Sequence, residues 1–170
     1  MNNEPYISKN QIGLAGEFAV LSQLALRGFD ANMTLANTKS VDILLSHQET
    51  RKMYKLEVKT HYDNNSYKSA DFGFIESHWR MGDKHETIDD STLFYCFVSI
   101  AQSTHSFDFY IIPSSVVAKF IKESHQYWLG GSDKRKDSTM RSFMLGKQGE
   151  IYKLDMPLAE DYKGRWDLLK

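Results

Sequence analysis

The chain has 170 residues, of which 41% are hydrophobic, so it is long enough to build one folded domain with a substantial core. Its formal net charge is −1, which excludes a uniformly basic protein that coats nucleic acid. No apolar stretch has the length of a membrane span, and the first residues lack the basic and apolar regions of a signal peptide. The single cysteine, Cys96, lies in the apolar run LFYCFVSI and is expected to be a buried thiol. We therefore expect a cytoplasmic protein with a single domain over residues 1–170 and no membrane partner.

The first part of the chain predicts one helix followed by three strands. Apolar residues recur at near-helical spacing from Ile12 to Arg27, and Gly28 follows at a position where helices often end in a left-handed residue. Short polar breaks then separate three extended segments, which predict an antiparallel meander. These segments are ANMTLA (31–36), SVDILLS (40–46) and KMYKLEVKTH (52–61).

The middle of the chain predicts a long loop and then a buried strand. Residues 62–91 show no sustained period, so we expect a loop or insertion with at most one helical turn. Residues 92–100 are continuously apolar, as in a strand covered on both faces.

The rest of the chain predicts a strand, a helix and a C-terminal extension. A strand over 107–113 should end at Pro113, and Ser114 or Ser115 should cap a helix that runs to Gly130. Beyond it we expect a charged loop, a hairpin within 143–156 and a tail that packs its tryptophan and leucines on the body. The fold class is α/β, with a mixed β-sheet flanked by helices in the order α-β-β-β-loop-β-β-α, a core over about 11–130 and an extension over 131–170.

The stretch MYKLEVKTH carries the most informative polar residues. Alternate residues of a strand share a face, so Glu57 and Lys59 should lie side by side. Such a pair is often only a solvated ion pair, and the chain has a second one in Asp161 and Lys163. The first pair differs because Asp42 lies in the apolar strand immediately before it, where a half-buried acid is costly unless it is paired or binds a metal.

Two carboxylates and a backbone carbonyl that converge at one point can hold a hard divalent cation such as Mg²⁺ or Mn²⁺. Such an ion polarises a phosphate oxygen and lowers the pKa of bound water. A lysine beside it can orient or deprotonate the attacking water and stabilise the charge of the transition state. The combination therefore favours hydrolysis of a phosphodiester bond.

The motif SVDILL followed by LEVKT, after a helix that contains GEFAVLSQLALRGF, resembles the PD-(D/E)xK nuclease superfamily. The order of elements over roughly 11–120 is similar to the restriction-endonuclease-like core of that superfamily, and in particular to its small prokaryotic endonuclease-like members. Val41 stands where the superfamily name has proline. The resemblance implies a metal-dependent endonuclease that acts on DNA, and it leaves a homodimer open.

The resemblance also implies roles for individual residues. Asp42 and Glu57 would bind Mg²⁺ or Mn²⁺ together with the carbonyl of Val58, and Lys59 would be the catalytic lysine. Glu17 matches an acid that many members place near the metal, although an acid here also suits the boundary between core and solvent. Polar groups that directly follow the lysine often touch substrate in such proteins, and Thr60 and His61 occupy those positions.

Other interpretations remain. The basic run that contains Lys134, Arg135 and Lys136 can grip phosphates or form a solvated loop. The six histidines have no paired spacing that favours zinc. The chain could also be a catalytically silent binding or assembly module on the same fold, or an RNA nuclease.

Overall fold

A computed structural model describes residues 6–34 and 41–170. Its main sheet has five strands in the order β1-β2-β3-β7-β8. All neighbouring strands are antiparallel except β3 and β7, which are parallel, so the sheet is mixed as expected. Two further pairs of strands, β4 with β5 and β6 with β9, form separate two-stranded sheets.

The helical elements are α1 (Lys9–Ala25), η1 (Asp83–Thr87), α2 (Ser114–Gly130), α3 (Ala159–Tyr162) and η2 (Trp166–Leu169). The strands are β1 (Phe29–Met33), β2 (Ile43–His47), β3 (Met53–Tyr62), β4 (Tyr67–Ser69), β5 (Gly73–Ile75), β6 (Ser77–Gly82), β7 (Leu93–Ile100), β8 (Phe107–Pro113) and β9 (Met140–Leu145).

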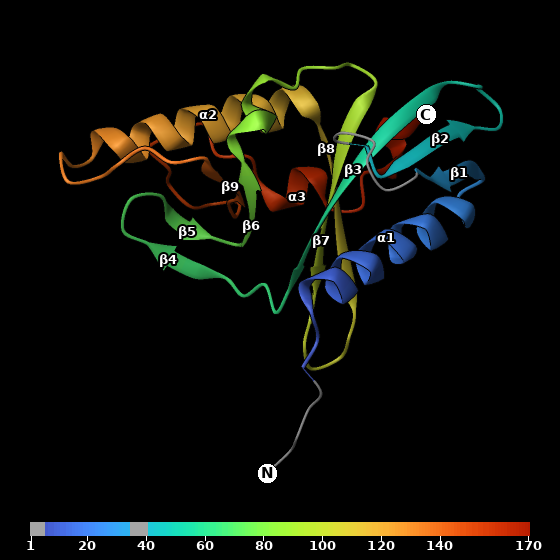
Figure 1. Cartoon of the computed structure of the whole chain (residues 1–170), viewed down its shortest axis with the longest axis horizontal. Helices are drawn as coiled ribbons and strands as arrows, with labels where there is room; N and C mark the ends of the chain where they lie inside the picture. Colours follow the sequence, from blue (N-terminus) through green and yellow to red (C-terminus); the bar gives the residue numbers. More distant parts are fainter. Residues whose placement is uncertain (1–5, 35–40) are drawn as a thin grey trace, which may run out of the picture.

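The central sheet separates two hydrophobic cores, and α1 and α2 lie on opposite sides of its long strands (Figure 1). On the α1 side, Val20 and Leu24 pack with Leu56 and Val58 of β3. On the α2 side, Phe120 and Ile121 pack with residues of β6, β7 and β9. Strand β7 contributes alternate side chains to both cores, which confirms the prediction of a strand covered on both faces. No helix of the described residues is long and apolar enough to cross a membrane.

Several local predictions are confirmed. Helix α1 begins earlier than expected, because Ser8 and Gln11 form a capping box at its N-terminus. Gly28 adopts the left-handed backbone with φ of 78°. The tail packs on the body through Trp166 and Leu169, and Cys96 is buried. Residues 35 and 36 of the predicted strand 31–36, and residue 40 of the predicted strand 40–46, lie outside the described residues.

Three predictions are wrong. Residues 62–91 are not a loop: they form β4, β5, β6 and η1, of which only the single helical turn was foreseen. The hairpin within 143–156 does not form, because β9 pairs with the distant β6 instead. No side chain caps α2, since the hydroxyl of Ser114 donates to the carbonyl of Asp90 and accepts a hydrogen bond from its amide.

Gly16 sets the distance between α1 and the strand that carries Glu57. A Cβ atom at this position would lie 1.9 Å from Oγ1 of Thr60 and 2.9 Å from its Cβ. Threonine is stiff at its first side-chain torsion and cannot turn aside easily. Only glycine therefore allows the helix to approach β3 this closely, and Glu17 follows directly in the sequence.

We predict that Gly16→Ala lowers the free energy of unfolding by about 1–3 kcal/mol, because the added methyl group overpacks a tight contact. Gly13→Ala is the matched control: it lies in the same helix and its Cβ would meet no atom within 4 Å. This control should gain about 0.5–1 kcal/mol from the higher helix propensity of alanine. Urea denaturation of the two variants measures both values, and equal effects would contradict the steric argument.

Candidate active site

The register of β2 and β3 places Asp42 opposite Glu57. Ile43 pairs with Leu56, and Asp42 is the residue just before this pair. Its backbone N–H donates to the carbonyl of Leu56 at 2.8 Å. Its carboxylate Oδ2 accepts a hydrogen bond from the amide of Val58 at 2.7 Å. The Asp42 carboxylate thus accepts the hydrogen bond that a backbone carbonyl of β2 would otherwise accept from Val58. This contact fixes the carboxylate beside β3.

Glu57 and Lys59 share one face of β3 and form the ion pair that the alternating pattern predicts. Nζ of Lys59 lies 2.5 Å from Oε1 of Glu57. Glu57 is 4% exposed, so this carboxylate is almost completely withdrawn from water. Its second oxygen, Oε2, is buried and has no hydrogen-bond partner within the described part of the chain. A buried carboxylate oxygen without a partner is costly, which distinguishes this pair from a solvated surface ion pair.

The carbonyl of Val58 points toward Asp42. The N–H and C=O of one residue lie on the same side of a strand, and the Val58 amide is bonded to the Asp42 carboxylate. Strand β2 begins only at Ile43, so it does not pair with β3 at this level. The carbonyl oxygen is therefore directed at the end of the ladder, beside the two acids.

Glu17 of α1 is close enough to sense this group electrostatically. Burial raises the pKa of its carboxyl group, and the negative charge of Asp42 raises that pKa further. The ammonium of Lys59 acts in the opposite direction and lowers it. The structure therefore brings all four predicted catalytic residues into one electrostatic neighbourhood, with Glu17 approaching from the helix and the others from the sheet.

The donor set fits a hard divalent cation. Asp42 and Glu57 offer carboxylate oxygens, Val58 offers a carbonyl, and Oε2 of Glu57 lacks a partner. Among residues 6–34 and 41–170, no three His, Cys, Asp or Glu side chains converge closely enough to hold a metal by themselves. Any cation here would thus rely on two carboxylates, backbone oxygen and water, which is the coordination that magnesium accepts.

The predicted substrate contacts are not all near this group. The hydroxyl of Thr60 lies against Gly16 beneath α1, on the face of the sheet opposite Lys59. Nδ1 of His61 lies 2.8 Å from the carbonyl of His78, at the same end of β3 as the lysine. The basic run 134–136 follows α2 at the end of the molecule farthest from β2 (Figure 1). Within this run, Arg135 forms an ion pair with Asp71 and lies over the ring of Trp128.

The sequence pattern did not identify two buried residues, His85 and Tyr95, as neighbours of the acids. Nδ1 of His85 lies 2.7 Å from the hydroxyl of Tyr95, whose residue is in register with Glu57 on the neighbouring strand. Burial and, after it, the charges of Lys59 and Lys84 lower the pKa of His85 to about 4, so the imidazole is neutral at pH 7. Burial and the charge of Glu57 raise the pKa of Tyr95. Only the tertiary fold brings η1 to this strand.

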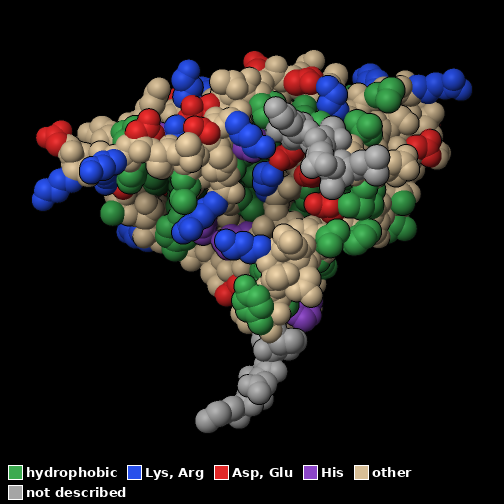
Figure 2. Space-filling view, in the orientation of Figure 1, with side chains coloured by type: hydrophobic (Ala, Val, Ile, Leu, Met, Phe, Trp, Pro, Cys, Tyr) green, Lys and Arg blue, Asp and Glu red, His purple; other side chains and the backbone are tan. Residues whose placement is uncertain are grey.

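Basic side chains gather next to the candidate site. Figure 2 shows Lys, Arg and His side chains collected over β6 and the neighbouring part of the surface. Arg80 on β6 and Lys84 in η1 are exposed, and the ring of His78 packs edge-on against both His61 and Tyr67. Positive charge with interleaved rings suits a nucleic-acid strand better than the distant run 134–136 does.

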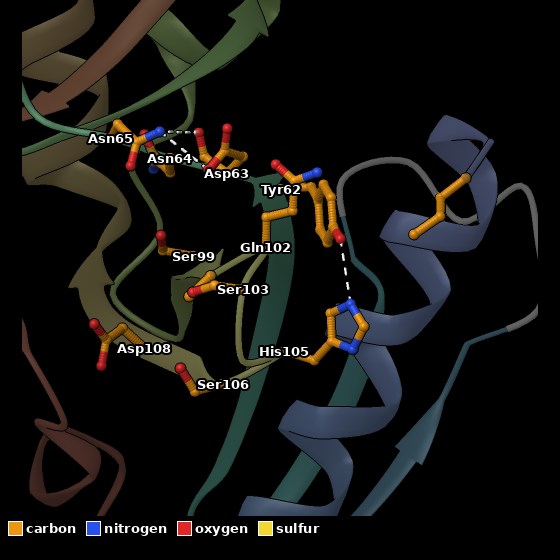
Figure 3. Close-up of a pocket in the computed structure, with 12 residues that line it drawn as sticks. Tyr62, Asp63, Asn64, Asn65, Ser99, Gln102, Ser103, His105, Ser106 and Asp108 are labelled. Carbon is orange, nitrogen blue, oxygen red and sulfur yellow. Dashed lines mark hydrogen bonds between the residues drawn. The ribbon is translucent and has the colours of Figure 1, made fainter. Parts of the chain in front are cut away.

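A pocket that is separate from the candidate site lies at the far end of β3, and its lining is polar and partly acidic. Its volume is about 720 Å³, and it opens between the end of β3 and the loop that joins β7 to β8 (Figure 3). Asp63, Asp108 and His105 line it together with amides and hydroxyls, and its lining within residues 6–34 and 41–170 includes no lysine or arginine. At 3.2–3.4 Å per residue, it begins about 16 Å along β3 from Glu57. It offers no lysine or arginine from the described residues to a phosphate, so we do not assign the reaction to it.

The sequence matches no protein-family model and no curated protein. Among solved structures, the chain is similar to a bacterial homing endonuclease, I-Ssp6803I, with a TM-score of 0.51 and 13% sequence identity. The match covers 96% of this chain and 93% of that chain. At this identity the likeness shows a shared fold: the mixed sheet and its flanking helices form an architecture that an endonuclease also has.

Glu17 yields a test of the electrostatic arrangement. Its folded-state pKa is raised above the ordinary value of 4.5, so ionisation of this group opposes folding above that pH. We predict that Glu17→Gln is more stable than the wild type at pH 7, by less than about 1 kcal/mol because solvent screens a partly exposed group. The difference should shrink as the pH falls toward 4.5 and should be nearly absent at pH 3.5, where the carboxyl group is protonated in both states. Urea denaturation at pH 7 and pH 3.5 measures it, with exposed Glu49→Gln as control. A wild type more stable than Glu17→Gln at pH 7 would refute the assignment.

Proposed function

We propose that the protein is a metal-dependent endonuclease that hydrolyses phosphodiester bonds of DNA. The observation that carries the proposal is the group formed by Asp42, Glu57 and Lys59, in which a buried carboxylate oxygen has no partner. The fold shared with a homing endonuclease supports it. So does the sequence resemblance to the PD-(D/E)xK superfamily, whose motif residues are these three.

In this proposal, Asp42, Glu57 and the carbonyl of Val58 hold Mg²⁺ or Mn²⁺. When bound, the ion would polarise a phosphate oxygen and lower the pKa of a bound water. Asp42 is kept in place by the Val58 amide, so the first acid needs no rearrangement to serve as a ligand. Glu57 is held by Lys59 and by the sheet around it.

Lys59 assists the attack of water in the proposed reaction. The side chain of Lys59 is 26% exposed, whereas that of Glu57 is 5% exposed, so the lysine lies at the boundary where a phosphate and water can approach. It can orient the attacking water and stabilise negative charge in the transition state. The basic side chains over β6 would bind the backbone of the DNA that passes the site.

The decisive experiment supplies supercoiled, linear, single-stranded and four-way-junction DNA, and RNA, with Mg²⁺ or Mn²⁺. We predict metal-dependent cutting of at least one DNA substrate, and a loss of about 100-fold or more in Asp42→Asn and in Lys59→Ala. Gel electrophoresis of the products measures the rates, and circular dichroism checks that each variant is folded.

Lys163→Ala is the matched control, because Lys163 belongs to the second acid-x-lysine triplet and pairs with Asp108 away from β3. It should cut at the wild-type rate. Cutting of RNA alone would replace DNA by RNA as substrate. Binding of nucleic acid without cutting, in every metal, would instead favour the catalytically silent module.

A further inference from the structure

A pocket that is separate from the candidate active site opens between the β4–β5 pair, α2 and β9. Its volume is about 300 Å³, at the lower end of the range for pockets that bind small organic molecules. Three aromatic rings line it, those of Tyr67, Phe72 and Trp128. Serine hydroxyls line it as well, from Ser69, Ser124, Ser138 and Ser142. The pocket therefore combines flat apolar surfaces with groups that both donate and accept hydrogen bonds.

The charged and titratable side chains of this pocket already have partners. Within the described residues, each such side chain of the lining contacts a group of opposite sign: Arg141 with Glu86, His125 with Asp137, and Asp71 with Arg135. A phosphate would have to compete with these acids for the bases. A neutral, flat ligand with a polar edge matches the lining better, and a nucleobase is such a ligand.

The pocket lies on the side of the central sheet that carries Lys59. Tyr95, which is in register with Glu57 on the neighbouring strand, packs in the core on the α2 side. Alternation along β3 directs Lys59 and His61 to that side as well. Helix α2 and strand β9, which line the pocket, pack in the same core. The lysine and the pocket are therefore not separated by the sheet.

A row of rings leads from the lysine to the pocket. The ring centroid of His61 lies 4.9 Å from that of His78 on β6, which lies 5.4 Å from that of Tyr67 on β4. Strand β6 lies between β3 and the β4–β5 pair (Figure 1), so this row bridges them. Tyr67 is 41% exposed and lines the pocket itself. Bases of any identity can stack on such rings, because every base has an aromatic face.

A basic side chain lies beside the pocket. Arg80 of β6 is in register with Ser142 of β9, and residues in register on antiparallel strands share a face. Burial raises the pKa of Tyr67, and the positive charge of Arg80 acts in the opposite direction, as expected for a guanidinium near this ring. Arg80 is exposed, so it can contact the phosphate of a nucleotide whose base lies in the pocket.

We infer that this pocket binds an unpaired nucleobase of a DNA strand, whose backbone continues past Arg80 and the row of rings to Lys59. A base inside a duplex is paired and stacked on both faces, so it enters such a pocket only by leaving the helix. The substrate class is therefore DNA with unpaired bases beside the scissile phosphate, such as a single strand or a flap. The inference rests on the proposed function for the reaction at Lys59, but the binding is measured without any cutting.

Fluorescence anisotropy of the full chain in EDTA tests the inference, because no metal is then available for cutting. The probes are a labelled oligothymidylate of about 20 nucleotides and an abasic strand of the same length, which keeps the phosphates and lacks the bases. The wild type should bind oligothymidylate at least about tenfold more tightly than the abasic strand. A duplex with a bulge of unpaired thymines should likewise bind more tightly than the fully paired duplex.

Four variants separate base binding from phosphate binding. Tyr67→Ala removes a ring of the pocket and should reduce the preference for oligothymidylate to below about threefold, with binding of the abasic strand unchanged. Ser142→Leu narrows the pocket from β9 and should have the same effect. Arg80→Ala should weaken the binding of both strands by a similar factor, because it removes a phosphate contact. Tyr6→Ala is the matched control and should keep the preference, since its ring is 89% exposed and lies outside the pocket.

Circular dichroism checks that each variant is folded. A wild type that binds the two single strands equally, or binds neither, would overturn the inference. A preference that survives in folded Tyr67→Ala or in folded Ser142→Leu would do so as well. The nuclease proposal fails separately: a protein that prefers oligothymidylate but cuts nothing with Mg²⁺ or Mn²⁺ would contradict the proposed reaction and leave the assignment of the pocket intact.

Discussion

The arrangement of the candidate site depends on one hydrogen bond, from the amide of Val58 to the carboxylate of Asp42. Strand β2 begins one residue later, so the side chain of Asp42 takes the place of a backbone acceptor in the ladder. This bond fixes an acid across from Glu57, on the side of β3 toward which the Val58 carbonyl points.

The second constraint acts from the other side of the sheet. Gly16 allows α1 to contact Thr60, and the helix thereby delivers Glu17 to the edge of the acidic group. Burying several carboxyl groups together costs folding free energy unless protons or cations compensate their charge. Lys59 compensates one oxygen of Glu57, and the other oxygen remains without a partner. The structure thus maintains a polar group that stability alone does not explain, as functional sites commonly do.

The sequence predicted the parts of this account that follow from local periodicity. Alternation along β3 placed Glu57 and Lys59 on one face, and the short turn before β3 made Asp42 their neighbour. Contacts between distant segments were not predictable in this way. Strand β6 pairs with β9 about sixty residues later, so the stretch between β3 and β7 looked structureless although it supplies His85, His78 and Arg80. The run 134–136 attracted attention through its charge density, yet charge density does not say where a loop lies in the fold, and this one lies far from the acids.

The most direct test of the account is the binding of Mn²⁺ to the purified protein, measured by isothermal titration calorimetry without any substrate. The wild type should bind the ion, and Asp42→Asn and Glu57→Gln should each weaken the binding at least about tenfold, whereas Lys163→Ala should not change it. A wild type that binds no Mn²⁺, or one whose binding survives both substitutions, would contradict the assignment of these carboxylates as a metal site and with it the proposed reaction.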